Sequence, residues 1–161
     1  MSQGSWGFDS DAEDALRASA IAGSPAASYE LASWARRVGG YLVDVIVLML
    51  ALIVVGIGFA ISDALGVILV VLWVGAFFLG YWVLFEGGES GQTFGKRAVG
   101  IRVRAESGGR AGYGKALMRN LVARVIGLFP FVGLIDVLWP LWDDKNQCLH
   151  DKAASTIVVR A

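Results

Sequence analysis

The sequence predicts an all-α membrane protein built around a two-helix transmembrane hairpin, joined by a third, broken helical segment and a short two-stranded β ribbon. Three observations favour this fold class. Of 161 residues, 56% are hydrophobic and only 17% are charged, a balance that is rare among soluble domains. Two long apolar runs follow each other almost without interruption, and the charged residues are segregated from them.

The two predicted spans are residues 38–61 and 64–85. The first run contains one charged residue, Asp44, and the second contains none. A bilayer core of about 30 Å requires about 20 apolar residues of helix, and only a helix or a closed barrel satisfies its own backbone groups there. Because only Ser62 and Asp63 separate the runs, we expect an antiparallel hairpin.

Basic residues flank the hairpin on one side only. Arg36 and Arg37 precede the first span, and the link between the spans has no basic residue. Six basic residues follow the second span: Lys96, Arg97, Arg102, Arg104, Arg110 and Lys115. The positive-inside rule therefore predicts a multi-pass protein of the plasma membrane with a cytoplasmic N-terminus.

The third apolar segment, about residues 116–142, does not have the composition of a simple span. Its apolar stretch, residues 120–142, contains Arg124 and Asp136 and is interrupted by Pro130, Gly133 and Pro140. A kinked third span would place the C-terminus outside, whereas a re-entrant or interfacial segment that breaks near Pro130 would keep it inside. The second interpretation is favoured, because a crossing would export three basic residues, Lys145, Lys152 and Arg160.

Two short runs, residues 99–105 and 155–160, have the pattern of β-strands. In the first, Ile101 and Val103 alternate with arginines, and the second is dense in β-branched residues. A single strand would leave its backbone groups unpaired. We therefore expect the two runs to form a small ribbon in the cytoplasm.

The remaining composition narrows the possibilities further. Residues 1–30 resemble a flexible, acidic cytoplasmic tail, which leaves 31–161 as the membrane domain. Acidic and basic residues number 14 each, which gives no indication of nucleic-acid binding. One cysteine, Cys148, and one histidine provide neither a disulfide nor a zinc cluster, so no metal or cofactor is expected.

Three motifs in order carry a family resemblance. They are Arg37 with Asp44 seven residues later, the loop and strand at 91–103, and the tail motif at 149–156. Over about residues 31–161 the chain resembles the RDD family of small prokaryotic membrane proteins, with Phe94 in place of a frequent proline and Ser155 in place of a common glycine. The resemblance implies that Arg37, Asp44 and Asp151 are the Arg and two Asp of the family name, but it brings no agreed molecular activity.

Asp44 requires an explanation, because an acidic group inside an apolar span costs about 2.5–3.5 kcal/mol on insertion scales. It should therefore face protein and find a partner. Arg124, or next Arg119, is the expected partner, which would fasten the third segment to the hairpin. The alternative is that Asp44 titrates or binds a cation.

The loop motif and the tail motif each have two interpretations. The loop residues Gly91, Gln92, Thr93, Gly95 and Lys96 differ from a nucleotide-binding loop in spacing. They are expected to form a tight turn and a capped short helix with Lys96 at lipid headgroups, or alternatively a lipid or small-anion site. In the tail motif, Asp151 is expected to cap a turn or to pair with a basic residue of the 96–104 loop, and a proton relay with His150 is the alternative.

Three functions follow from these predictions. The favoured one is a non-enzymatic structural or accessory module that contacts membrane lipids and forms a homo-oligomer or joins a larger membrane complex. The alternative is proton-coupled cation transport by an oligomer, with Asp44, Arg124 and Asp136 on the path. An enzyme is not expected, and no residue is assigned a catalytic role.

Overall fold

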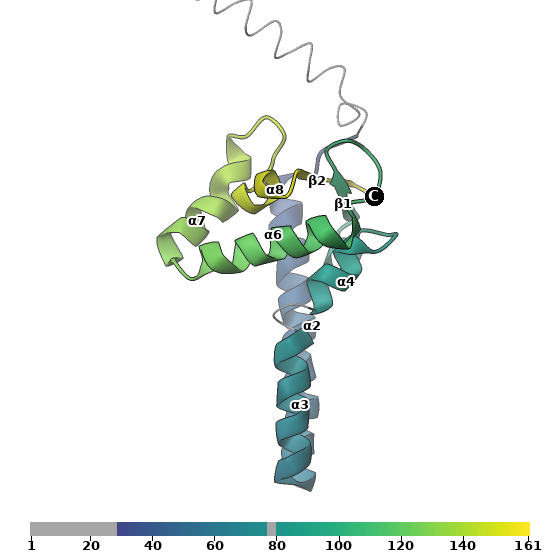
Figure 1. Ribbon diagram of the computed structural model, residues 1–161, viewed down its shortest axis with the longest axis vertical. Helices are drawn as coiled ribbons and strands as arrows, with labels where there is room; N and C mark the ends of the chain where they lie inside the picture. Colours follow the sequence, from purple (N-terminus) through teal and green to yellow (C-terminus); the bar gives the residue numbers. More distant parts are fainter. Residues whose placement is uncertain (1–28, 77–79) are drawn as a thin grey trace, which may run out of the picture.

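The computed structural model describes residues 29–76 and 80–161, so the predicted tail lies outside the described residues as far as residue 28. Two helices, α2 (Trp34–Ile61) and α3 (Asp63–Gly75), project side by side from a cap formed by the rest of the described chain (Figure 1). The cap contains the other helices and a ribbon of two strands. The architecture is mostly helical, as predicted.

Within the described residues, α2 is the one helix that is long and apolar enough to cross a membrane; it has 28 residues. The described parts of the second predicted span are α3, with 13 residues, and α4 (Tyr81–Gly87). Ala76 and Gly80, which lie on either side of residues 77–79, both have helical backbone conformations of the π type.

The turn between α2 and α3 is as tight as the sequence predicts. Ser62 ends α2 and caps α3, where its Oγ accepts the backbone N–H of Leu65 at 3.2 Å. The two helices then pack closely: a Cβ on Gly58 would lie 3.5 Å from the Cα of Gly66. Small residues at a crossing allow this close backbone approach.

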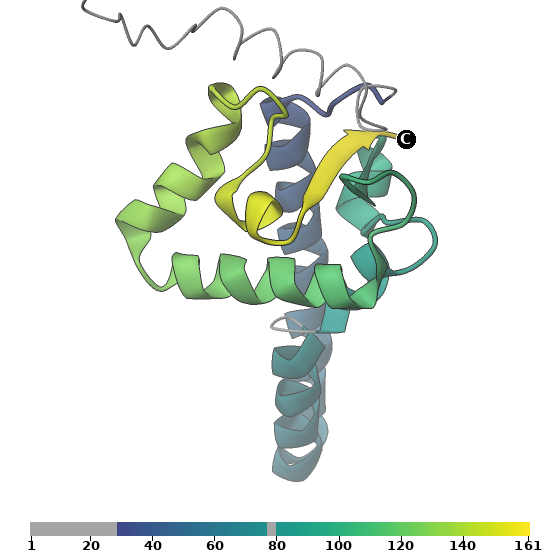
Figure 2. The same cartoon turned by 45° about the horizontal axis from the view of Figure 1, so that its top comes forward.

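The third apolar segment is broken where the sequence predicts. Helix α6 (Gly112–Gly127) ends before Phe129, whose backbone is extended, and α7 (Pro130–Leu138) starts with proline at its first position. Proline is favoured there because its missing N–H is not needed. A 3₁₀ turn, η3 (Trp139–Leu141), follows, and α6 and α7 meet at a sharp angle (Figure 2).

The predicted ribbon is confirmed. Strands β1 (Ile101–Ala105) and β2 (Thr156–Arg160) pair antiparallel, with Ile101 opposite Arg160 and Ala105 opposite Thr156. Both outer edges are covered by other parts of the chain. The backbone N–H of Ala32 donates to the Val158 carbonyl at 2.9 Å, and that of Val103 donates to the Gly91 carbonyl at 2.8 Å.

The ribbon also forms the centre of the apolar core of the cap. Buried residues from both strands pack with the segment before α2 and the start of α6: Ala32, Ile101, Val103, Ala111 and Val158. Two short helices, α5 (Phe94–Ala98) and α8 (Leu149–Ala153), precede the two strands. Helix α5 packs against α2, and α8 packs against α6. The charged motifs are thereby brought to the N-terminal half of α2.

Candidate functional site

A chain of buried ionic contacts runs through the junction of α2, α4, α5, α6 and α8. We call it the buried charge network and define it by five residues: Arg37, Glu86, Lys96, Arg119 and Asp151. It joins residues that are far apart in the sequence. We take it as the candidate site because buried charges are rare and require partners.

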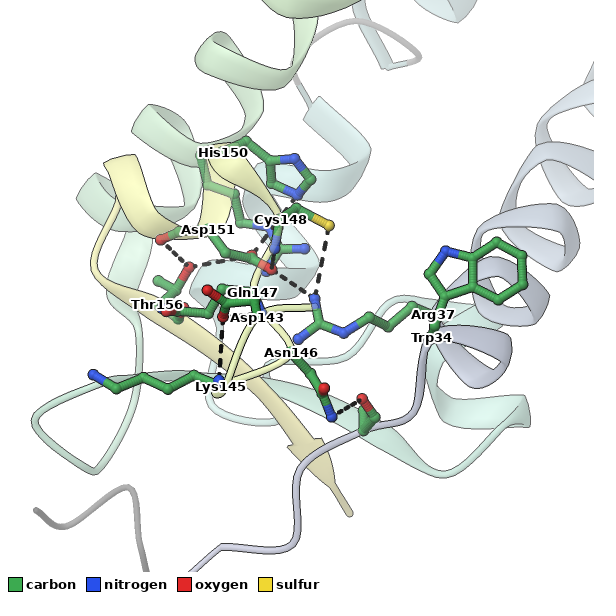
Figure 3. A network of polar contacts seen from close by, with 12 residues as sticks. Trp34, Arg37, Asp143, Lys145, Asn146, Gln147, Cys148, His150, Asp151 and Thr156 are labelled. Carbon is green, nitrogen blue, oxygen red and sulfur yellow. Dashed lines mark hydrogen bonds and ion pairs between the residues drawn. The ribbon is translucent and has the colours of Figure 1, made fainter. Parts of the chain in front are cut away.

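Asp151 pairs with two arginines of the network. Its Oδ2 lies 2.6 Å from Nη1 of Arg37 (Figure 3). Its Oδ1 lies 2.9 Å from Nη1 of Arg119. The same carboxylate accepts the backbone N–H of Cys148 at 3.2 Å, which caps α8. The structure thus shows the predicted capping role, but the basic partners come from α2 and α6 and not from the 96–104 loop.

The electrostatics of Asp151 favour its charged form. The side chain is fully buried, and burial alone would raise its pKa. The positive charges of Arg119 and Arg37 outweigh burial and hold the pKa of Asp151 far below its ordinary value of 3.8. Asp151 is therefore ionised at neutral pH, and it binds α8 to both α2 and α6.

Glu86 extends the network toward the loop motif. Its carboxylate lies 2.7 Å from Nζ of Lys96 and 3.3 Å from Nε of Arg119, and it accepts a hydrogen bond from the Asn120 amide at 3.2 Å. Lys96 is buried in this contact. The expectation that Lys96 reaches lipid headgroups is wrong, because its ammonium group is engaged by Glu86 inside the cap.

Asp44 lies in a separate polar cluster on α2. Its carboxylate accepts three hydrogen bonds of 2.6 Å, from the Tyr81 hydroxyl, the Thr93 hydroxyl and the Gly95 backbone N–H. The expected pairing with Arg124 or Arg119 is wrong. Asp44 is fully buried, and neutral donors on α4 and α5 satisfy it.

Two glycines explain why α5 reaches Asp44. Gly40 and Gly95 bring α2 and α5 into backbone contact, and a Cβ on Gly95 would lie 1.9 Å from the Gly40 carbonyl oxygen. Thr93 caps α5 by accepting the Lys96 N–H at 3.2 Å, as the sequence predicts for a capped short helix. Gly91 has a φ of +64°, which allows its carbonyl to pair with β1.

Arg124 and Asp136 have other neighbours. The guanidinium carbon of Arg124 lies 4.6 Å from the ring centroid of Trp82, a cation–π contact. Asp136, on α7, lies 2.6 Å from Nδ1 of His150 and accepts the backbone N–H of that residue at 3.1 Å. His150 therefore faces Asp136, while its Nε2 lies 3.7 Å from Asp151.

Asp136, Cys148 and His150 also offer three metal-ligand types within 4.8 Å of one another. The sequence did not reveal this group, because Asp136 lies on a different helix. Burial, and to a smaller extent the negative charge of Asp151, raises the pKa of the Cys148 thiol to about 12. The thiol is therefore protonated at neutral pH, whereas a metal ion binds the thiolate. Arg37 lies 4.0 Å from the same sulfur, and its positive charge disfavours a divalent cation.

The most important residue that the sequence analysis missed is Glu86. It directly follows the apolar run that ends at Phe85, where an acidic residue looks like an ordinary surface charge. Tyr81 and Asn120 were also missed as polar partners. The available signal was an acidic residue at the end of an apolar run, ten positions before a lysine of a glycine-rich loop.

Comparison with known proteins gives one family and two kinds of relative. The model of the RDD family matches residues 31–155. The chain is 34% identical over 76 residues to a proline-rich antigen homolog of Mycobacterium tuberculosis, covering 47% of this chain and 30% of that protein. It is 32% identical over 74 residues to a proline-rich antigen of Mycobacterium leprae, covering 45% and 28%. The matched region is thus less than a third of either relative, and no solved structure matches.

Proposed function

Because the chain belongs to the RDD family, we propose that it is a non-enzymatic structural or accessory module of the plasma membrane. In this proposal α2 and α3, with the residues that lead into α4, form a transmembrane hairpin. The other elements form a cap on the cytoplasmic side. The module acts by presenting this cap to a larger membrane complex or to further copies of the chain.

The apolar surface of the hairpin supports the membrane part of the proposal. Large aliphatic side chains of α2 and α3 are exposed over their whole length, including Leu50, Ile53, Ile61 and Val71. Such a surface is unstable in water and suits lipid. The basic residues gather at the cap end, and the Ser62 turn has none, which favours a cytoplasmic cap.

The third segment fits this arrangement as an interfacial element. Leu128, Phe129 and Phe131, at the turn between α6 and α7, are each more than half exposed. We infer that this turn enters the headgroup region while both helices stay on the cytoplasmic side. The C-terminal ribbon then lies on the same side as the N-terminal end of α2.

The observation that carries the proposal is the internal pairing of the buried charges. Each of the two carboxylates in the buried charge network has two cationic partners within 3.3 Å. Asp44 has three hydrogen-bond donors of its own. Groups saturated in this way fix the positions of helices, whereas a transport path or a catalytic centre requires groups that can exchange partners.

Copurification in a mild detergent tests the proposal directly. The full chain, tagged and expressed in its native host, should retain a membrane protein at constant stoichiometry or migrate as a defined homo-oligomer. A chain that migrates as a monomer and retains no partner, under detergents that preserve its fold, would contradict the accessory role.

Cation transport through Asp44 is the competing hypothesis, and it requires a separate test. Proteoliposomes with a pH gradient should show no dissipation when sodium or potassium is added. Dissipation that disappears in Asp44→Asn, but not in the exposed control Asp63→Asn, would instead establish Asp44 as a transport residue.

The alternative of a lipid or small-anion site at the 91–96 loop receives less support, because Lys96 is buried and its ammonium group contacts Glu86.

A further inference from the structure

A cavity of about 730 Å³ lies between the first turns of α2, helix α4 and the angle formed by α6 and α7. This volume is in the range of sites that hold small organic ligands. Its lining includes residues of the buried charge network and Leu128, which is exposed in the turn between α6 and α7. Neither the family resemblance nor the proposed accessory role accounts for it.

The lining of the cavity combines apolar and ionisable side chains. The second half of α6 and α7 contribute apolar side chains, such as Val125, Ile126, Leu128 and Val137. Ionisable side chains come from α2, α4 and α5 and also from α6 and α7. An occupant that satisfies both kinds of lining must have an apolar portion and a charged portion.

The balance of charge at the cavity selects the sign of the occupant. Four cationic side chains line the cavity, against two carboxylates, Glu86 and Asp136. The cations are Arg37, Lys96, Arg119 and Arg124. Asp151, which does not line the cavity but pairs with Arg37 and Arg119, reduces the net charge from +2 to +1, and this positive balance favours an anion over a metal ion or alkali cation.

Arg37, which lines the cavity, has hydrogen-bond donors without an acceptor. Its Nη1 is engaged by Asp151, but its Nε and Nη2 are buried and lack an acceptor among residues 29–76 and 80–161. The side chain is 10% exposed. A buried donor without a partner costs about 1–3 kcal/mol, more on a charged group, so an added acceptor at this point would be stabilising.

We propose that this cavity binds an anionic phospholipid, with the phosphate at the guanidinium groups of Arg37 and Arg124 and an acyl chain along α6 and α7. Arginine suits this role because its planar fork donates two hydrogen bonds to a phosphate. In this proposal the ligand reaches the cavity from the bilayer at the turn between α6 and α7, where Leu128 is both exposed and part of the lining. A free phosphate compound shares the headgroup chemistry, but it would leave the apolar lining from α6 and α7 exposed to water.

Native mass spectrometry of the detergent-solubilised full chain, with added phosphatidylglycerol or phosphatidylcholine, tests the proposal. Arg124→Gln removes a cation, and Arg110→Gln is its control, because Arg110 is a surface arginine outside the cavity. Ala123→Phe fills the cavity, and Leu121→Phe is its control, because Leu121 is exposed on the same helix and does not line the cavity. Thermal unfolding of each variant establishes that it is folded.

The expected result is one tightly retained phosphatidylglycerol per chain, with affinity reduced about tenfold in Arg124→Gln, the loss equivalent to about 1.4 kcal/mol. Ala123→Phe should also lose the lipid, and the two controls should retain it. Equal retention of both lipids by all variants would indicate nonspecific surface lipid and overturn the proposal. Binding of inorganic phosphate with the same dependence on Arg124, but no retained lipid, would overturn it in favour of a soluble phosphate ligand. If Ala123→Phe does not fold, the comparison of Arg124→Gln with Arg110→Gln decides.

Discussion

Replacing Asp151 by asparagine keeps the shape of the side chain and removes the charge that two arginines share. In the wild type, Asp151 Oδ2 lies 2.6 Å from Arg37 Nη1, and Oδ1 lies 2.9 Å from Arg119 Nη1. The side chains of Asp151 and Arg119 are both at least nine-tenths buried. Removing one partner from a buried ionic contact costs about 3–5 kcal/mol, because the opposite charge stays buried without compensation. We expect Asp151→Asn to destabilise the folded cap by this amount.

Intrinsic fluorescence of the six tryptophans during heating in detergent provides the assay. For a chain of this length, a loss of 3–5 kcal/mol corresponds to a decrease in Tm of about 6–20 °C. Asp144→Asn is the matched control, since Asp144 is exposed and should change stability by less than about 0.5 kcal/mol. A decrease for Asp151→Asn no larger than that of the control would refute the structural role of the network.

The same substitution has a pH signature. The folded-state pKa of Asp151 is lower than its ordinary value of 3.8. The carboxylate therefore stabilises the folded state above about pH 4, and this contribution is lost as the pH falls below 4 toward the folded-state pKa. The difference in Tm between wild type and Asp151→Asn should be constant from pH 6 to 8 and should shrink in more acidic buffer. A difference that grows on acidification would contradict the assigned charge state.

Three further predictions concern the neighbouring elements. Gly95→Ala should abolish folding, because the added Cβ would lie 1.9 Å from the Gly40 carbonyl oxygen. Gly114→Ala should fold normally, because a Cβ added there would have no neighbouring atom within 4 Å. Detergent-soluble yield and gel filtration test both variants. Asp44→Leu should lower the Tm more than Asp44→Asn does, because leucine accepts no hydrogen bond from the three donors that face Asp44. Equal decreases in Tm for the two variants would contradict these hydrogen bonds. Cys148 should react with a maleimide at pH 7 only after the chain is unfolded in SDS, because the side chain is buried and burial raises the pKa of its thiol to about 12. Rapid labelling of the folded chain would contradict this burial.

The elements that the sequence predicted well have strong local signals. Alternation in 101–105 and β-branched residues in 156–160 predicted the ribbon, and Pro130 predicted the break between α6 and α7. The second apolar run was predicted as one span, and its described residues are helical in α3 and α4, because apolar composition indicates a helix but not where its ends lie.

The candidate site was less accessible to sequence reasoning, because its contacts are long-range. Arg37, Arg119 and Asp151 were each identified as candidate charges, but their mutual pairing depends on the placement of α8 against α6. Asp44 was expected to require an arginine. The structure supplies neutral donors instead, since the contact of Gly40 with Gly95 brings the start of α5 to the carboxylate.

Site-specific cysteine labelling can determine whether α2 and α3 form a membrane hairpin with the cap on the cytoplasmic side. In a Cys148→Ser background, Ser62→Cys tags the hairpin turn and Ser107→Cys tags the cap, and both positions are exposed. With a membrane-impermeant maleimide, right-side-out vesicles should be labelled at position 62 only, and inverted vesicles at position 107 only. Labelling of both positions from the same side would contradict the proposed topology.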